Sequence, residues 1–220
     1  MKIWLDGAVV DLAAARLSPI DRGVTVGDGV FETLRVYDGT PFSWRRHHER
    51  LCHSANALGL AVPDSATLRG AAESVLAANS LREARLRITV SGGEGPPGSS
   101  RAGAVPRAWI TAWPFASAND VAAVVIAPWT RNEHSATAGI KTISYAANVR
   151  ALAFAEERGA AEAIFANTSA NLCEATGSNV FCVHEGRLRT PPLSAGCLAG
   201  VTRGLVLELA LSLGLDVAEA

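Results

Sequence analysis

Three of the five pairs in which an acidic residue precedes glycine constrain the fold of this chain, because each of the three can reverse an extended segment. The three pairs are Asp6-Gly7, Asp38-Gly39 and Glu185-Gly186. Glycine adopts the positive φ angles that tight hairpin turns require, and aspartate, which precedes it in two of these pairs, adopts them more readily than most residues. The first pair follows the strand-like run 2–5, and the second follows the alternating run 31–37. The pattern therefore predicts antiparallel pairing in both halves of the chain.

Helix signals alternate with these strand signals. The helix 44–58 should end at Gly59, and a second helix should be capped by Asp64 or Ser65. Expected helices are 44–58, 65–79, 144–158 and 201–213. Further expected strands are 85–91, 108–113, 121–127, 163–166 and 179–183. The segment 114–120 resembles a linker, so we expect a small α/β domain over 1–113 and a larger domain over 121–220, in a mixed α+β or α/β fold.

Charge and hydrophobicity exclude several classes of function. The 220 residues have a formal net charge of -1, which gives no long-range attraction for nucleic acid or an anionic membrane. No apolar run approaches the ~18 residues that a transmembrane helix needs. The apolar run at the start of the chain is too short for a signal peptide, because polar residues follow it too early. We therefore expect a cytoplasmic protein that binds neither nucleic acid nor membrane.

The four cysteines, Cys52, Cys173, Cys182 and Cys197, show neither a C-x-x-C pair nor a histidine at metal-binding spacing. Isolated buried thiols and no metal site are the expectation.

One glycine pattern matches a nucleotide-binding fingerprint but lacks its chemistry. Gly93-x-Gly95-x-x-Gly98 follows an expected strand, as a dinucleotide-binding turn would. That turn works by directing backbone N–H groups at a pyrophosphate, whereas Pro96 and Pro97 have no N–H. The segment 92–100 is therefore expected to be a surface or lid loop.

The choice of basic residues draws attention to one lysine. The chain has twenty lysines and arginines, of which only Lys2 and Lys141 are lysines. Arginine stays charged, whereas a lysine can become a neutral amine that forms a Schiff base or removes a proton. Lys141 is therefore either a chance surface lysine or the reactive amine of a site.

A Schiff-base cofactor such as pyridoxal phosphate needs further groups, and the chain offers candidates. Gly200-Val201-Thr202 opens an expected helix whose N–H groups and hydroxyl could bind a phosphate. Glu174 could keep the pyridine nitrogen protonated, and Arg50 could pair with the phosphate. Each also has an ordinary explanation as a helix cap, a surface carboxylate or a solvated charge.

In their order along the chain, these residues resemble the class IV, fold-type IV pyridoxal-phosphate enzymes. This family holds D-amino-acid and branched-chain aminotransferases and 4-amino-4-deoxychorismate lyase. The matching motifs are Asp21-Arg22-Gly23, Gly27-Asp28-Gly29-Val30-Phe31-Glu32, His47-x-x-Arg50-Leu51, Gly139-Ile140-Lys141, Asn148, Asn167, Glu174-x-x-Gly177-Ser178-Asn179-Val180-Phe181 and Leu198-x-Gly200-Val201-Thr202-Arg203. The resemblance implies a two-domain fold like that of D-amino-acid aminotransferase, a pyridoxal 5'-phosphate cofactor, a small amino substrate and a homodimer.

The resemblance also implies a role for each matching residue. Lys141 would form the Schiff base and later move the substrate proton, and Glu174 would pair with the pyridine nitrogen. Arg50, the Val201 backbone and Thr202 would bind the phosphate. Leu198 would pack on the ring, and Tyr145 would approach the phenolic oxygen or serve as a core aromatic.

The motifs lean toward one reaction of the family. Phe31 replaces the tyrosine of the D-aminotransferases, and the segment Ile88-Thr89-Val90-Ser91-Gly92-Gly93 lacks their Arg-x-His. The branched-chain signature Gly-Asn-Tyr is replaced by Thr-Ile-Ser-Tyr, and the glycine-rich loop is similar to that of the lyase. We therefore expect a lyase that releases pyruvate to give 4-aminobenzoate, with an amino-acid aminotransferase as the alternative.

A third alternative is a non-catalytic relative. The family usually continues some tens of residues past the helix that ends near Leu213, and that segment supplies a second hydroxyl to the phosphate. The sequence given ends at Ala220. Without that segment, the site would lack a hydrogen bond worth about 1.5–3 kcal/mol. The presence of Lys141 and Glu174 argues for an active enzyme.

Overall fold

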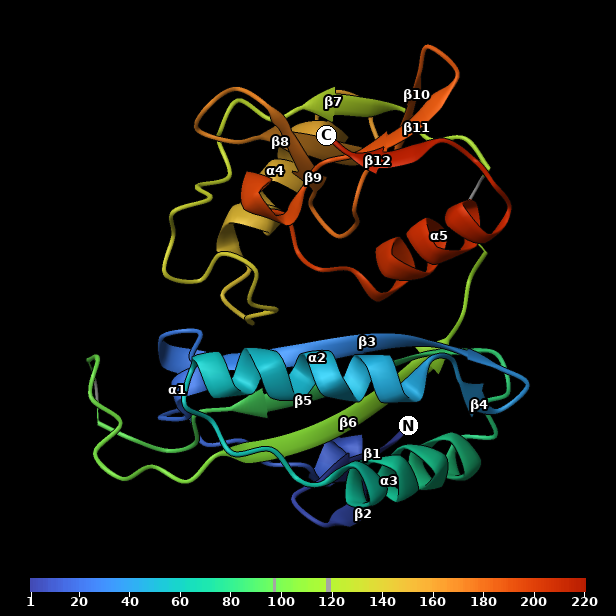
Figure 1. Cartoon of the computed structure of the whole chain (residues 1–220). Coiled ribbons are helices and arrows are strands. Elements are labelled where there is room, and N and C mark those ends of the chain that lie inside the picture. The colour runs from blue at the N-terminus through green and yellow to red at the C-terminus, as the bar shows by residue number, and fades with distance from the viewer. Residues whose placement is uncertain (97, 118–119) are drawn as a thin grey trace. The chain divides into compact units, whose positions relative to one another are not determined.

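Contacts between residues divide the chain into two compact units. The computed structural model describes residues 1–96, 98–117 and 120–220 (Figure 1). The first unit contains Met1–Ser117 and Ile140–Ser144, and the second contains Ala118–Gly139 and Tyr145–Ala220. These units differ from the expected domains 1–113 and 121–220, because the segment with Lys141 belongs to the first unit. The expected domain division stays a prediction. Residues 118–119 of its linker, and Pro97 of the glycine-rich loop, lie outside the described residues.

The first unit is built on an antiparallel sheet of six strands with the order β2-β1-β6-β5-β3-β4. The strands are β1 (Lys2–Leu5), β2 (Ala8–Asp11), β3 (Gly29–Tyr37), β4 (Thr40–Pro41), β5 (Ala84–Ser91) and β6 (Arg107–Pro114). Strand β3 pairs with β5 from Gly29 opposite Ser91 to Val36 opposite Ala84. This long ladder fixes the residues of β3 firmly in the unit.

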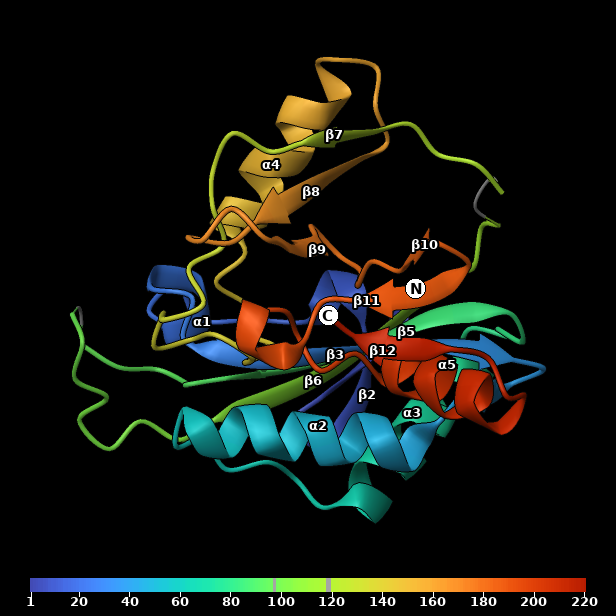
Figure 2. The ribbon, with the colours of Figure 1, turned by 45° about the horizontal axis from the view of Figure 1, so that its top comes forward.

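Helices cover one face of this sheet (Figure 1, Figure 2). They are α2 (Trp44–Ala57) and α3 (Ser65–Ala78), preceded by the short η1 (Leu12–Ala14) and α1 (Arg22–Thr25). Alternate β3 residues Val30, Leu34 and Val36 are fully buried and form a core with helix residues such as Leu51 and Leu68. Because side chains alternate along a strand, Glu32 lies on this same covered face.

The second unit contains two small sheets. In the first, β7 (Val124–Ile126) runs parallel to β8 (Glu162–Ala166), which pairs antiparallel with β9 (Leu172–Ala175). In the second, β10 (Cys182–His184) pairs antiparallel with β11 (Arg187–Thr190), and β12 (Val217–Glu219) runs parallel to β11. The helices are α4 (Ala146–Glu156) and α5 (Val201–Ser212), with η2 (Leu193–Ala195) between them. Helix α4 packs on β8 through an alanine-rich core that includes Ala151, Ala155 and Phe165.

All three acidic–glycine turns are confirmed. Both residues of each pair have positive φ: 44° and 102° at Asp6-Gly7, 47° and 77° at Asp38-Gly39, and 50° and 75° at Glu185-Gly186. Each turn joins two neighbouring antiparallel strands. The local turn chemistry therefore sets the strand pairing at these three places.

Several expected elements differ from the observed ones. The expected strand 179–183 is wrong at its start, because residues 179–181 have no regular structure and β10 begins at Cys182. The expected strand 121–127 shortens to β7, and the expected helix 144–158 begins only at Ala146. Apolar composition at 121–123 and 179–181 suggested strands there, but strand hydrogen bonds are set by neighbours that composition does not reveal.

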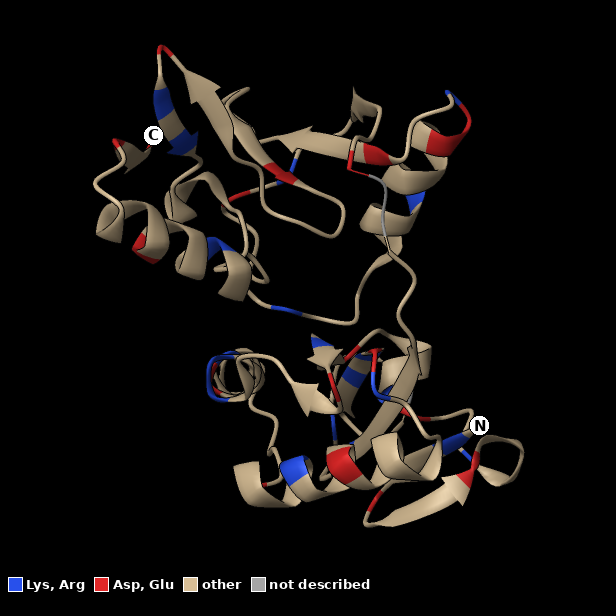
Figure 3. Cartoon of the chain, turned by 90° about the vertical axis from the view of Figure 1, so that its right-hand side faces the viewer, with Lys and Arg blue, Asp and Glu red and all other residues tan. Residues whose placement is uncertain are grey.

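Charged residues of both signs are interspersed within each unit, in keeping with the near-zero net charge (Figure 3). No helix in the described parts of the chain is both long and apolar enough to cross a membrane. Those same parts contain no cluster of three or more His, Cys, Asp or Glu side chains that could hold a metal ion. The expectation of buried thiols is wrong for Cys182, which is exposed on β10, whereas Cys173 and Cys197 are buried and Cys52 is partly buried.

Candidate active site

Lys141 is held by backbone hydrogen bonds within the first unit. The Phe31 N–H on β3 donates to the Lys141 carbonyl at 3.0 Å. The Lys141 N–H donates to the Ser54 hydroxyl on α2 at 3.1 Å. Strand β3 and helix α2 therefore fix both sides of the peptide that carries this lysine.

A glycine lets the lysine segment lie close to β3. The Ile143 N–H donates to the Gly29 carbonyl at 2.9 Å. A Cβ at Gly29 would lie 2.7 Å from the Ile143 Cδ1 atom and 2.5 Å from the Val90 carbonyl oxygen. The backbone of β5 cannot easily move away from such a Cβ, so a side chain at position 29 would disturb β5, and it would also displace the end of the Ile143 side chain.

The side chain of Lys141 lies against an aromatic ring. Its Nζ atom is 4.4 Å from the centre of the Phe31 ring, and the Arg87 guanidinium is 3.7 Å from the centre of the same ring. Cations within about 6 Å of an aromatic ring are attracted to it. Phe31 therefore offers the lysine amine an aromatic surface.

Arg50 lies on α2 and pairs with a buried carboxylate on β3. Its Nε atom donates to Glu32 Oε1 and its Nη2 atom to Glu32 Oε2, both at 2.7 Å. The Nδ1 atom of His47 also lies 2.7 Å from Glu32 Oε2. Burial alone would raise the pKa of Glu32, but the hydrogen bonds from Arg50 and His47 outweigh it and hold the pKa below its ordinary value.

Glu174 occupies a comparable position in the second unit. It lies on β9, where its Oε2 atom accepts a hydrogen bond from the Leu198 N–H at 2.9 Å. Its Oε1 atom is 3.3 Å from Arg131 Nε. The Arg131 guanidinium also stacks 4.3 Å from the centre of the Phe165 ring. These neighbours hold the carboxylate in one orientation.

The start of α5 has the features of an anion-binding turn. Gly200 is its N-cap and makes no side-chain capping hydrogen bond, and Val201 and Thr202 form the first turn. A Cβ at Gly200 would lie 1.9 Å from the Asn179 Oδ1 atom, so a larger residue there would displace the Asn179 side chain. The Asn179 amide in turn donates to the Leu198 carbonyl at 2.8 Å. First-turn N–H groups and an exposed hydroxyl are suitable donors for a phosphate.

Tyr145 precedes α4 in the second unit. Its hydroxyl donates to the Thr176 carbonyl at 3.2 Å. The buried Asn148 amide donates to the same carbonyl. Its role toward a cofactor oxygen therefore stays a prediction, and the observed contact ties α4 to the turn after β9.

The expected site residues form two groups, one in each unit. In the first unit, Arg50 and Lys141 are tied to the same pair of elements, β3 and α2. In the second unit, a hydrogen bond joins the Leu198 backbone to Glu174, and α5 begins shortly after Leu198. Each group contains one part of the machinery that the sequence predicts: the amine in one unit and the carboxylate in the other.

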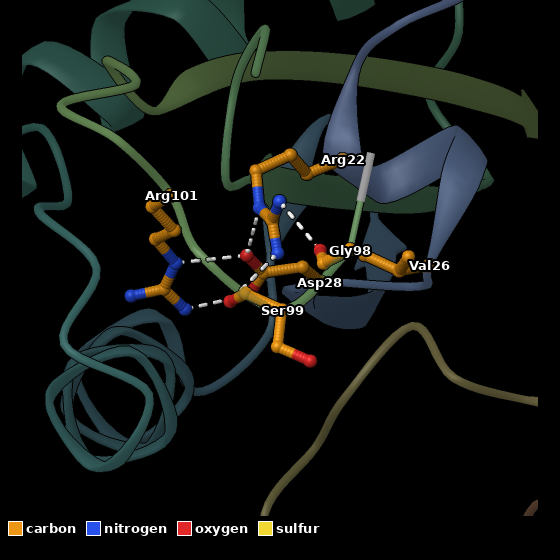
Figure 4. A pocket seen from close by; sticks show the side chains of 6 residues that line it. All are labelled: Arg22, Val26, Asp28, Gly98, Ser99 and Arg101. Carbon is orange, nitrogen blue, oxygen red and sulfur yellow. Dashed lines mark hydrogen bonds and ion pairs between the residues drawn. The ribbon is translucent and has the colours of Figure 1, made fainter. Parts of the chain in front are cut away.

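The glycine-rich loop lines one side of an open pocket in the first unit, with a volume of about 490 Å³, and Arg22, Val26 and Asp28 contribute to the rest of its lining (Figure 4). Asp28 pairs there with Arg22 at 3.0 Å and with Arg101 at 2.6 Å. Arg22 also donates to the carbonyls of Gly98 and Ser100, and Arg101 donates to that of Leu58. These arginines hold the loop to Asp28 and to the end of α2. The described residues of the segment 92–100 thus belong to a loop, as expected, and these contacts tie that loop to its neighbours.

Three residues of these arrangements were missed as functional candidates. Glu32 and His47 stood inside quoted motifs, and their flanking hydrophobic positions could have marked them as buried. Arg131 follows Trp129-Thr130 in a segment without periodicity, and nothing in the sequence indicates its contact with Glu174.

Sequence comparisons with known proteins show the family of this chain. The model of the family "Amino-transferase class IV" matches residues 29–220. The putative branched-chain-amino-acid aminotransferase of Methanocaldococcus jannaschii is 33% identical over 100% of this chain and 78% of its own length. The bifunctional aminodeoxychorismate lyase / D-amino acid transaminase of Mycobacterium tuberculosis is 30% identical over 98% of this chain and 80% of its own.

Solved structures agree with the sequence comparisons. The branched-chain aminotransferase of Thermoproteus uzoniensis, solved with norvaline, has a TM-score of 0.91 and 32% identity over 100% of this chain and 77% of that one. A hypothetical aminotransferase of Mycobacterium tuberculosis, solved with alpha-ketoglutarate and PMP bound, has a TM-score of 0.88 and 28% identity over 100% and 81%. The chain is therefore an enzyme of the class IV aminotransferase family, with the fold of the fold-type IV pyridoxal-phosphate enzymes.

Proposed function

We propose that this chain is a pyridoxal-phosphate-dependent amino-acid aminotransferase, and that a branched-chain amino acid is the first substrate to test. The observation that carries the proposal is the position of Lys141, whose peptide is fixed by β3 and α2 and whose amine lies on the Phe31 ring. The similarity to branched-chain aminotransferases over the whole chain supports the reaction type.

The residues fit this cofactor. The Gly200 site, where a Cβ would meet Asn179, and the first turn of α5 without a side-chain cap suit a phosphate. Val201, Thr202 and Arg50 would bind that phosphate, Leu198 would pack on the ring, and Tyr145 would approach the phenolic oxygen. When bound, pyridoxal phosphate supplies an aldehyde that forms a Schiff base and a ring that accepts electrons.

The protein's own residues would then hold and move protons. Lys141 would remove the α-proton of the amino substrate at Nζ and return it to a different carbon. Glu174 would hold a proton on the pyridine nitrogen through one carboxylate oxygen, while the Leu198 N–H and Arg131 orient that carboxylate. Phe31 would exclude water from the amine. We also propose that the protein forms a homodimer, which size-exclusion chromatography would test.

A lyase that releases pyruvate and gives 4-aminobenzoate is the second candidate, although the sequence motifs placed it first. The glycine-rich loop favours it, as does similarity to the bifunctional Mycobacterium tuberculosis lyase. The relatives support an aminotransferase more strongly than a lyase, so the aminotransferase is the main proposal. A single-substrate assay separates the two: pyruvate release from aminodeoxychorismate without an oxo acid supports the lyase, and strict dependence on an oxo acid supports the aminotransferase.

The decisive variant is Lys141→Arg, which keeps the charge but removes the nucleophilic amine. We expect its transamination rate to fall by at least about a thousandfold, since Lys141 would be both nucleophile and base. Borohydride should fix the cofactor on the Lys141 peptide of the wild type, as mass spectrometry would show, and not on this variant.

The chain offers a matched control for this experiment. Lys2, on β1, pairs with Asp11 at the surface, so Lys2→Arg should retain full activity and cofactor labelling at Lys141. Label on Lys2, or substantial turnover by the Lys141→Arg variant, would contradict the assigned role. Protein that stays colourless with added pyridoxal phosphate would contradict the proposal that this compound is the cofactor.

A further inference from the structure

Glu32 is a fully buried carboxylate in a row of apolar residues. Its side chain is 0% exposed, like those of Val30 and Leu34 on the same face of β3. A buried ion pair is usually no more stabilising than apolar side chains of similar volume. The core alone therefore gives no reason for a carboxylate at this position.

The hydrogen bonds of this carboxylate lead to one side of α2. Arg50 binds it side-on through Nε and Nη2, each at 2.7 Å, and His47 reaches Oε2 at the same distance. His47 and Arg50 lie one helical turn apart, so they share a helix face. The histidine and the arginine thus hold the two oxygens of one carboxylate between them.

This arrangement restricts the arginine more than the carboxylate. Glu32 lies within the β3–β5 ladder, which fixes its backbone. Arg50 has a long side chain that loses much of its rotamer freedom when it is ordered. Side-on pairing with Glu32 occupies the Nε–Nη2 edge and fixes the plane of the guanidinium before any ligand binds.

We infer that Glu32 and His47 are positioning residues for the cofactor phosphate, which they reach through Arg50. Glu32 sets the plane of the Arg50 guanidinium, and His47 holds the Glu32 carboxylate in place. Neither touches the cofactor. This inference rests on the proposed function, because it takes Arg50 to be a phosphate-binding residue.

The test separates the phosphate from the rest of the cofactor. Pyridoxal has the same aldehyde and ring as pyridoxal phosphate but no phosphate, so both form a Schiff base with Lys141. Titration of the apoenzyme with each compound, followed by absorbance or tryptophan fluorescence, gives two dissociation constants. Their ratio measures the phosphate contacts alone and needs no activity.

The informative variant is Glu32→Asp, which keeps the charge but draws the carboxylate back by one methylene. We expect the dissociation constant for pyridoxal phosphate to rise about tenfold or more, as for a weakened charge-assisted hydrogen bond, while that for pyridoxal stays unchanged. Equal changes for both compounds, or no change for either, would overturn the inference.

A matched pair elsewhere in the unit serves as control. Glu83 binds Arg35 at the surface, with its side chain 54% exposed, so Glu83→Asp makes the same chemical change outside the candidate site. It should leave both dissociation constants unchanged. In an Arg50→Ala background, Glu32→Asp should add no further loss of phosphate affinity, since its effect would run through Arg50.

Two further measurements keep the outcome clear. If Glu32→Asp fails to fold, His47→Leu is the alternative variant, because it removes the His47 contact to Glu32 and leaves both Arg50 contacts in place. The ratio of the dissociation constant for pyridoxal phosphate to that for pyridoxal should then rise about threefold. An unchanged ratio would count against the inference. If the wild type binds both compounds equally well, or Arg50→Ala leaves the ratio unchanged, the phosphate role of Arg50 fails. If the wild type and Arg50→Ala behave as proposed and only Glu32→Asp has no effect, then the positioning role of Glu32 fails and the phosphate role of Arg50 stands.

Discussion

The two units each pair a glutamate with an arginine, but the roles of the two residues are reversed. In the first unit Arg50 is the proposed cofactor contact and Glu32 lies behind it, at 2.7 Å and 0% exposed. In the second unit Glu174 is the proposed contact, and Arg131 lies 3.3 Å from it, with side chains 14% and 22% exposed. The same pair of residue types thus presents a cation in one unit and an anion in the other.

The supports of the two pairs also differ. Glu32 lies in the nine-residue strand β3, which pairs along most of its length with β5. Glu174 lies in the four-residue strand β9, whose pairing with β8 shifts register at Phe165/Ala166. The first pair is therefore fixed by a long ladder and a helix. The second depends on a short strand and on a backbone N–H at Leu198.

The largest expected difference between the two pairs concerns stability. Glu32→Gln should lower the free energy of unfolding by about 3–5 kcal/mol at neutral pH, because it leaves Arg50 without its buried counter-charge. The same change at the exposed Glu83 should have a much smaller effect, because solvent screens its pairing with Arg35. Urea denaturation of the two variants measures this difference, and equal losses would contradict the prediction.

The pH dependence of this loss has a definite sign. The folded-state pKa of Glu32 is below its ordinary value of 4.5, so its contribution is fully present above that pH and is lost as the pH falls through the lower folded pKa. The stability difference between wild type and Glu32→Gln should therefore shrink below about pH 4.5. A constant difference down to acid unfolding would show that Glu32 acts by shape and not by charge.

A smaller effect is expected for the second pair, and it should appear in activity instead of stability. Glu174→Gln should reduce the transamination rate by about a hundred- to a thousandfold, as expected when a preorganised charge at the reacting ring is removed. Arg131→Gln should reduce the rate by about tenfold, because it only loosens the orientation of Glu174. Steady-state kinetics of both variants measure these changes.

The second unit again offers a control. Glu157 pairs with Arg158 at the surface, at 3.5 Å, so Glu157→Gln makes the same change in a pair outside the candidate site. Its rate should equal that of the wild type. A larger loss for Arg131→Gln than for Glu174→Gln would reverse the roles assigned within the pair.

The smallest expected effect concerns the thiols. Burial raises the pKa of Cys173 in the second unit to about 12 and also raises that of Cys52 in the first. Cys182 is exposed, so a thiol reagent at mild alkaline pH should label it first and Cys173 last. Cys182→Ser should change the free energy of unfolding by less than about 0.5 kcal/mol. Early label on Cys173, detected by peptide mapping, would show that the second unit opens more readily than the first.

Local chemistry made much of the fold predictable. The Asp-Gly and Glu-Gly turns need only the conformational tolerance of two residues, and all three formed. The helix α3 begins after Asp64, whose carboxylate accepts a hydrogen bond from the Thr67 N–H, as the capping rule predicts. Strand β9, with its sequence Leu-Cys-Glu-Ala, carries no such signal, and its pairing depends on β8.

The candidate site was predictable residue by residue but not as an arrangement. Lys141, Glu174 and Arg50 were found through motif order, which reports identity and spacing. The carboxylate behind Arg50 and the guanidinium beside Glu174 depend on side chains meeting across different elements. The placement of Lys141 in the first unit also escaped prediction, because its hydrogen bonds to Phe31 and Ser54 join distant parts of the sequence.

The path of the chain through Ile140–Ser144 has a consequence for how such a gene can change. The first unit is completed by five residues encoded within the stretch that builds the second. Recombination at a point between β6 and β7 would join one parent's β3 and α2 to another parent's lysine segment, and Gly29 would then face an Ile143 from the other parent. Lys141 and the residues of β3 and α2 that hold it must therefore be inherited together, although they lie far apart in the sequence.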